Sequence, residues 1–160
     1  MVVAFPEPSN ALPREWPARR RTEKLVGLSL IVSGSVHGSI TQDHFKEWWG
    51  YGLFFMAAAV CLIVFGLALT TDAIDSQRTP GDVHKLRRIM YFAGLVGTIA
   101  LLALYALTRT AGIPFGPGAG TVETVAVPDV VANVTEVAAA FGLILLLWKA
   151  RSGVTLARRR

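Results

Sequence analysis

The sequence predicts an all-α fold: an integral membrane, antiparallel four-helix bundle with a Gly/Pro-rich external loop that caps its outer end. Three observations lead to this prediction. The chain has 160 residues, of which 52% are hydrophobic and 17% charged, whereas soluble domains carry about 25% charged residues. The apolar residues gather into runs near the roughly 20 residues that a helix needs to cross a bilayer. The basic residues alternate between the segments that connect these runs.

The distribution of the basic residues predicts the topology. Of the 16 Lys and Arg, five precede the first run, four lie between the second and third, and five follow the fourth. The two other connections hold only Lys46 and Arg109. Because cytoplasmic connections carry the excess of Lys and Arg, we expect a multi-pass protein of the bacterial cytoplasmic (inner) membrane with cytoplasmic N- and C-termini. The net charge of +5 then reflects topology, so we expect the lipid bilayer as a partner and no nucleic acid.

Residues 1–24 contain four prolines and end in a basic cluster, which predicts an irregular basic cytoplasmic arm. A four-helix transmembrane domain is expected at 25–148, and its first span, at about 25–41, is the shortest. Gly34 and Gly38 in this span would let another helix approach closely. We therefore expect the first helix to lie centrally in the bundle.

The other spans are expected at about 47–71, 87–107 and 128–148, and a basic cytoplasmic tail at 149–160. The only cysteine, Cys61, lies within the second span, so no disulfide can form within the chain.

A short external connection precedes the second span. Asp43 is a plausible N-cap for that helix, and a helix that begins there would put His44, Glu47 and Tyr51 on one face. Aromatic residues follow between Trp48 and Phe55. They fit either an interfacial belt or the wall of a ligand pocket.

His37 and Glu136 are ionisable residues inside predicted spans. Such residues cost roughly 2.5 to 3.5 kcal/mol each on insertion scales, so they often mark functional sites. A helical rise of about 1.5 Å per residue puts both at nearly the same depth in the outer half of the bilayer. Since the first and fourth helices run in opposite directions, we expect their side chains to come into contact.

A polar stripe runs down the fourth span, because Asp129, Asn133 and Glu136 follow one another at helical spacing. Asp129 also complements the positive N-terminal end of the helix dipole.

The Gly/Pro-rich loop before this span carries Glu123, and glycine allows it to fold tightly over the outer mouth of the bundle. We expect Arg109 to anchor the loop by pairing with one of three carboxylates: Glu123, Asp129 or Glu47.

The candidate binding residues are the histidines and carboxylates of the outer half: His37, His44, Glu47, Glu123, Asp129 and Glu136. Histidine with carboxylate suits a transition metal ion such as Cu, Zn, Mn or Fe, with His37 and Glu136 as the inner ligands. The sequence contains no tight ligand spacing such as His-Glu-x-x-His. A pocket for a proton-linked or organic ligand and a purely structural polar core are the alternatives.

Two polar and aromatic segments, followed by three carboxylates, look like those of a group of small bacterial four-helix integral membrane proteins. The residues that carry the resemblance are His44, Phe45, Glu47, Trp48, Trp49, Tyr51, Gly52, Phe54, Phe55, Thr108, Arg109, Thr110, Gly112, Ile113, Pro114, Gly116, Pro117, Glu123, Asp129 and Glu136. The resemblance implies four helices and does not imply an activity.

The leading functional hypothesis is a small membrane protein that binds a metal ion or small ligand in this His/carboxylate pocket. The competing class is a structural or accessory subunit of a larger membrane complex, or a homo-oligomer, that docks through the small-residue faces of the first and third spans. An integral membrane enzyme that uses a buried carboxylate as general base ranks third. The sequence contains no nucleophile elbow, Walker A loop or dinucleotide-binding fingerprint.

Overall fold

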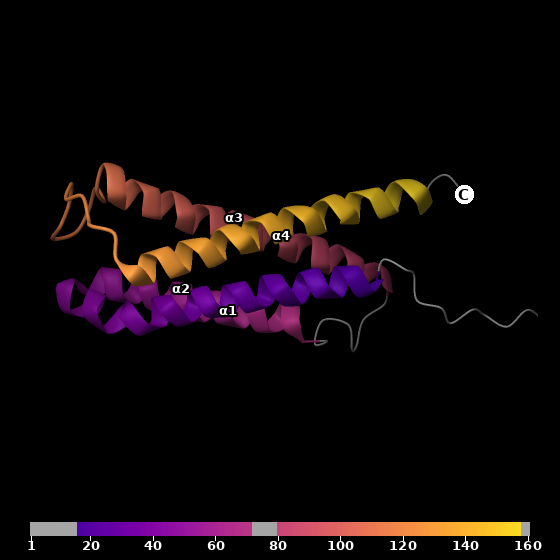
Figure 1. Cartoon of the computed structure of the whole chain (residues 1–160), viewed down its shortest axis with the longest axis horizontal. Helices are drawn as coiled ribbons and strands as arrows, with labels where there is room; N and C mark the ends of the chain where they lie inside the picture. The colour runs from indigo at the N-terminus through magenta and orange to yellow at the C-terminus, as the bar shows by residue number, and fades with distance from the viewer. Residues whose placement is uncertain (1–15, 72–79, 158–160) are drawn as a thin grey trace, which may run out of the picture.

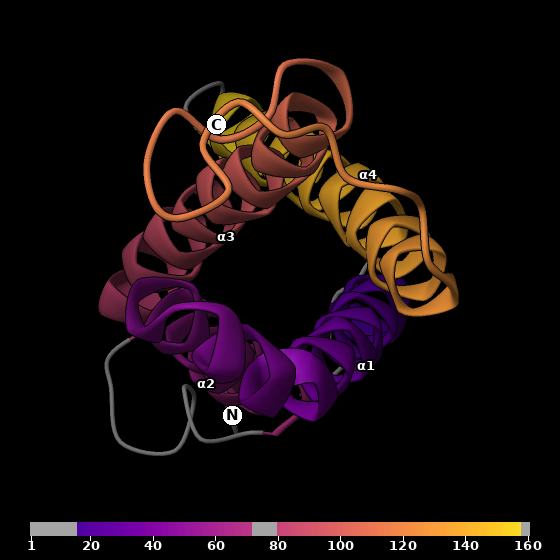
Figure 2. The ribbon, with the colours of Figure 1, turned by 90° about the vertical axis from the view of Figure 1, so that its left-hand side faces the viewer.

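The computed structural model describes residues 16–71 and 80–157, and within these ranges it is all-helical, without strands. The four helices are α1 (Trp16–Glu47), α2 (Trp49–Thr70), α3 (Pro80–Thr110) and α4 (Val127–Ala157). They extend along the long axis of the molecule (Figure 1) and surround a common centre when viewed from one end (Figure 2). The all-α prediction is confirmed.

α1 begins earlier than the predicted first span. It is helical from Trp16, so the irregular segment predicted for 1–24 is helical over its last part, while residues 1–15 lie outside the described ranges. Pro17 is tolerated because it lies in the first turn, where its missing N–H is not needed. Arg20 donates a hydrogen bond to Glu23 over 3.1 Å, and such a pair three residues apart stabilises a helix.

α4 likewise continues to Ala157, into the predicted tail.

The connection between α1 and α2 is a single residue, Trp48, whose backbone is extended. The prediction that Asp43 caps the second helix is therefore wrong, because Asp43 lies within α1. His44 and Glu47 also belong to α1, whereas Tyr51 belongs to α2, so the three do not share one helix face. Charged Lys46 and Glu47 precede the break and aromatic Trp49 and Tyr51 follow it, and the chain changes direction here without a side-chain cap.

Within residues 16–71 and 80–157, three helices are long and apolar enough to cross a membrane: Trp49–Thr70, Asp82–Thr110 and Val127–Ala150. Such helices are typical of membrane proteins. Among the described residues α1 does not reach the same apolar content, because Ser, Gly and His37 interrupt its apolar stretch.

α1 packs most closely on α2. A Cβ atom on Gly27 would lie 2.6 Å from the backbone oxygen of Gly66, and one on Gly34 would lie 2.9 Å from that of Ala59. The close approach predicted at Gly34 and Gly38 is therefore confirmed at Gly34, where the partner is α2, whereas a Cβ on Gly38 would make only an ordinary contact, 3.7 Å from Ala59. α1 also packs on α4, and α3 packs on α4.

The apolar core lies in the half of the molecule away from segment 111–126. Its buried residues come from all four helices: Val26, Leu30, Leu62, Leu69, Tyr91, Ala139, Leu143 and Leu146. The other half, next to segment 111–126, contains the candidate site.

Candidate functional site

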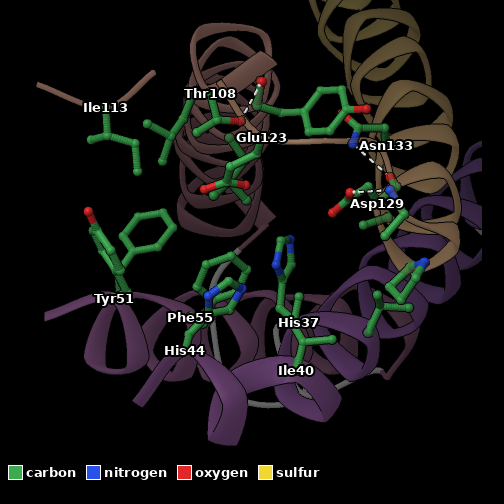
Figure 3. A pocket seen from close by; sticks show the side chains of 18 of the residues that line it. His37, Ile40, His44, Tyr51, Phe55, Thr108, Ile113, Glu123, Asp129 and Asn133 are labelled. Atoms are coloured by element: carbon green, nitrogen blue, oxygen red, sulfur yellow. Dashed lines mark hydrogen bonds between the residues drawn. The ribbon is translucent and has the colours of Figure 1, made fainter. Parts of the chain in front are cut away.

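A cavity of about 410 Å³ lies between the helices next to segment 111–126 (Figure 3). Its walls are mainly apolar and aromatic, from Val36, Ile40, Tyr51, Phe54, Phe55, Leu101, Leu104, Tyr105, Ile113 and Phe115. Its polar lining includes His37, Arg109, Glu123, Asp129, Asn133 and Glu136. A volume of roughly 300 to 1,000 Å³ and an apolar wall with a few polar groups are typical of small-molecule sites.

Glu136 and His37 form the polar centre of this cavity. Nε2 of His37 lies 2.9 Å from Oε1 of Glu136, so the contact expected from their matched depths is present. The hydroxyl of Ser33 donates a second hydrogen bond to the same oxygen over 2.8 Å. Glu136 is only 2% exposed and Ser33 is fully buried, so both residues lie away from the molecular surface.

The hydrogen bonds of His37 indicate its tautomer. Nδ1 is buried and has no hydrogen-bond partner among the described residues. A buried N–H without an acceptor costs about 1 to 3 kcal/mol, so Nδ1 is best left unprotonated. The proton then lies on Nε2, which donates it to Glu136.

Glu136 has one oxygen available to the cavity. Both of its hydrogen bonds end on Oε1, and within the described part of the chain no partner reaches Oε2. Glu136 lines the cavity. Three buried side-chain atoms of the described residues are fully covered and lack a partner, and Oε2 is not one of them. Oε2 is therefore the acceptor that this cavity offers to a ligand.

Arg109 joins segment 111–126 to α4. It donates to Glu123 and to Asp129, each over 2.6 Å, and its guanidinium lies 4.9 Å from the centre of the Tyr105 ring. Two of the three carboxylates predicted for this pairing are used, and Glu47 is not. Arg109 is thus a single cation shared by two cavity carboxylates.

Asp129 also stabilises the start of α4. Its Oδ2 accepts a hydrogen bond from the backbone N–H of Ala126 over 2.8 Å, which satisfies a free donor at the helix N-terminus. The predicted stripe is present, because Asp129, Asn133 and Glu136 all line the cavity, and the Asn133 amide donates to the backbone of Asp129. Figure 3 shows Asn133 and Asp129 across the cavity from Phe55 and His44.

Segment 111–126 is held to α3 by a backbone hydrogen bond and to α2 by a side-chain hydrogen bond. The N–H of Glu123 donates to the carbonyl of Thr108 over 3.1 Å, and the hydroxyl of Tyr51 donates to the carbonyl of Phe115 over 2.9 Å. Gly112 has a φ of +75° and lies against Gly120, where a Cβ would come within 2.6 Å of backbone. Only glycine fits this turn without strain.

His44 and Glu47 form a separate pair at the rim. Nδ1 of His44 lies 3.2 Å from Oε2 of Glu47, and the His44 ring stacks on Phe55 at 3.9 Å between centroids. His44 lines the cavity, whereas Glu47 does not, and its side chain is 58% exposed. Nearby Asp43 accepts a hydrogen bond from Lys46, which lowers the pKa of Asp43.

The arrangement does not suit a metal ion. No group of three or more His, Cys, Asp or Glu within the described ranges could hold one. The six candidate ligands are divided instead among three partnerships: His37 with Glu136, His44 with Glu47, and Glu123 with Asp129 through Arg109. The guanidinium already occupies the position that a cation between the last two carboxylates would take.

Sequence reasoning missed a second buried polar cluster, at the opposite end of the helices. Glu23 is fully buried and accepts hydrogen bonds from Arg87 and Tyr91 of α3. Arg20 adds an ion pair at 3.1 Å. The available signal was an acidic residue within the basic run from Arg19 to Lys24. This cluster ties α1 to α3, two helices that otherwise make few contacts.

The chain was compared with protein-family models, with curated proteins and with solved structures, and none of them matches it. Function is therefore inferred from the cavity and its side chains.

Proposed function

We propose that the chain is a membrane protein that binds a small, mainly apolar ligand in this cavity, with Glu136 and His37 as its polar contacts. The observation that carries the proposal is the buried carboxylate of Glu136, which uses one oxygen internally and turns the other to an apolar cavity of about 410 Å³. A purely structural core would use both oxygens, because an unsatisfied buried acceptor costs free energy.

The proposal includes a topology. The four helices form an antiparallel transmembrane bundle in the inner membrane, with both termini cytoplasmic and segment 111–126 as an external cap. The alternation of basic segments supports this orientation. The lining contributed by Ile113, Phe115 and Glu123 supports the role of the segment as a cap.

A metal ion is less well supported as the ligand. His37 is the only histidine that touches a cavity carboxylate among the described contacts, and one histidine with one carboxylate is two donors short of a tetrahedral site.

The accessory-subunit hypothesis keeps only part of the feature that suggested it. Some small residues of α1 and α3 are in contact within the chain: Gly34 meets α2, and a Cβ on Gly94 would lie 2.5 Å from the Phe65 ring. Gly38 and Gly97 remain exposed, so each face is occupied in part.

The test is to purify the protein from bacterial membranes into lipid nanodiscs and to analyse the bound small molecules by liquid chromatography and mass spectrometry. We expect a molecule enriched near one per chain in the wild type and depleted in the Glu136→Gln variant. Glu47→Gln is the matched control, because Glu47 does not line the cavity, and it should keep the molecule. Equal amounts in all three proteins, or a stoichiometric metal ion on elemental analysis, would overturn the proposal.

A further inference from the structure

We infer that the ligand is a membrane-dissolved molecule with a ring headgroup that carries an O–H or N–H donor, and with an apolar tail that lies between α2 and α3. This inference rests on the function proposed above and names the class of ligand.

Among the described residues, α2 and α3 meet toward the end of the molecule that contains the apolar core. There Gly94 of α3 lies against Phe65 of α2, so closely that a Cβ would come within 2.5 Å of the ring. Extensive packing joins α1 to α2, α1 to α4 and α3 to α4, but not α2 to α3. α3 tilts away from α2 toward segment 111–126 in both views (Figures 1 and 2).

One face of α3 borders the space between these two helices. Gly97, Leu101, Leu104 and Thr108 follow one another at intervals of three and four residues, so they share a helix face. The last three line the cavity. Nothing lies within 4 Å of the position that a Cβ on Gly97 would occupy. Gly97 is exposed, and the open space beside it lies on the same face of α3 as the cavity-lining residues.

The opposite wall of this space belongs to α2 and reaches the surface. Phe54 lines the cavity and is 40% exposed, so the cavity communicates with the outside at its side. α2 and α3 are both apolar enough to cross a membrane. In a bilayer this opening faces lipid acyl chains, and it suits an apolar tail.

The polar groups of the cavity select the headgroup. Four carboxylates (Asp43, Glu123, Asp129 and Glu136) line the cavity with one arginine. Arg109 is already paired with Glu123 and Asp129, and Asp43 is paired with Lys46. Oε2 of Glu136 can accept a hydrogen bond, but no described residue donates one to it. It therefore favours a ligand with an O–H or N–H donor and disfavours an anion. The rings of Phe55 and Tyr105 line the same space and suit a ring headgroup.

The experiment measures equilibrium binding of four probes to the protein in nanodiscs, with binding to empty nanodiscs subtracted and affinities expressed per mole fraction in the bilayer. The probes are 4-nonylphenol, nonylbenzene without the hydroxyl, 4-ethylphenol without the long tail, and the anion 4-nonylbenzoate. We expect 4-nonylphenol to bind saturably, and nonylbenzene and Glu136→Leu each to weaken binding on the order of tenfold, as expected for a hydrogen bond to a charged group.

Gly97→Leu tests the tail. Nothing lies within 4 Å of the position of its Cβ, so the variant should fold. It should weaken 4-nonylphenol several-fold and leave 4-ethylphenol unchanged, while the matched variant Gly97→Ala should have little effect on either probe.

Equal affinity for 4-nonylphenol and nonylbenzene would refute the donor, tighter binding of 4-nonylbenzoate would refute the choice of headgroup, and insensitivity to Gly97→Leu would refute the tail. If no probe binds but a different molecule copurifies in a Glu136-dependent way, the inference fails and the proposed function stands. If no probe binds and nothing copurifies, both fail.

Discussion

The polar cluster of Ser33, His37 and Glu136 allows a test of whether these residues serve function or stability. We expect the triple variant Ser33→Ala, His37→Phe and Glu136→Leu to be at least as stable as the wild type. The reason is that a carboxylate inside a membrane costs roughly 2.5 to 3.5 kcal/mol on insertion scales. When all members of a buried ion pair or triad are replaced together by apolar residues, the protein is often equally stable or more stable by about 1 to 4 kcal/mol.

The single variant Glu136→Leu provides the contrast. It removes the same carboxylate but leaves the hydroxyl of Ser33 and the N–H of His37 without their acceptor, since both bonds end on Oε1. Each stranded donor costs about 1 to 3 kcal/mol. Both variants lack the carboxylate, so its contribution is the same in each. The free energy of unfolding of the triple variant should therefore exceed that of the single variant by about 2 to 6 kcal/mol, the cost of two stranded donors.

Stability can be measured by titration with sodium dodecyl sulfate in mixed micelles, with helicity followed by far-ultraviolet circular dichroism. A triple variant that is less stable than the wild type by more than about 2 kcal/mol would refute the reasoning, because it would show that the cluster is a net stabilising core. The ligand measurements above should show loss of binding in the same protein.

Three further predictions concern the contacts that hold the helices together. Gly27→Leu should destabilise the protein by at least about 1 to 3 kcal/mol in the same titration, because its side chain would meet the backbone of α2; an unchanged midpoint would contradict that packing. Arg87→Met should cost about 1.5 to 3 kcal/mol by removing one cationic hydrogen-bond partner of buried Glu23, which keeps Arg20 and Tyr91, and adding Glu23→Gln should recover part of the loss; a double variant as unstable as the single one would show that the charge of Glu23 is not the cause. Arg109→Gln should speed hydrogen exchange in segment 111–126, because both of its ion pairs are lost, and equal exchange would show that the backbone hydrogen bonds suffice.

The pairing of His37 with Glu136 could be predicted because it depends on simple quantities. The rise per residue places each side chain at a depth, and opposite helix directions bring equal depths together. The same is true of Arg109, which had few basic neighbours and several carboxylates within reach. His37 lies 2.9 Å from Glu136, and Arg109 lies 2.6 Å from Glu123.

The predictions for Asp43, Glu47 and Glu23 were less successful. The first two depended on where a helix begins, and the break at Trp48 lies in a stretch without proline or a used side-chain cap. Glu23 was assigned to an irregular arm, and its burial depends on Arg87 and Tyr91, which lie more than sixty residues away in the chain. No local pattern reports such a contact.

The sequence by itself determined the helices and the polar residues near segment 111–126, because composition, periodicity and charge alternation act over one or two helical turns or over whole connections. Only the tertiary structure decided what the segment from Arg109 to Glu136 does. It divided the candidate metal ligands into three separate partnerships, left one oxygen of Glu136 available, and tilted α3 away from α2. These outcomes depend on side-chain directions and on helix packing angles, which follow from interlocking surfaces across the whole chain.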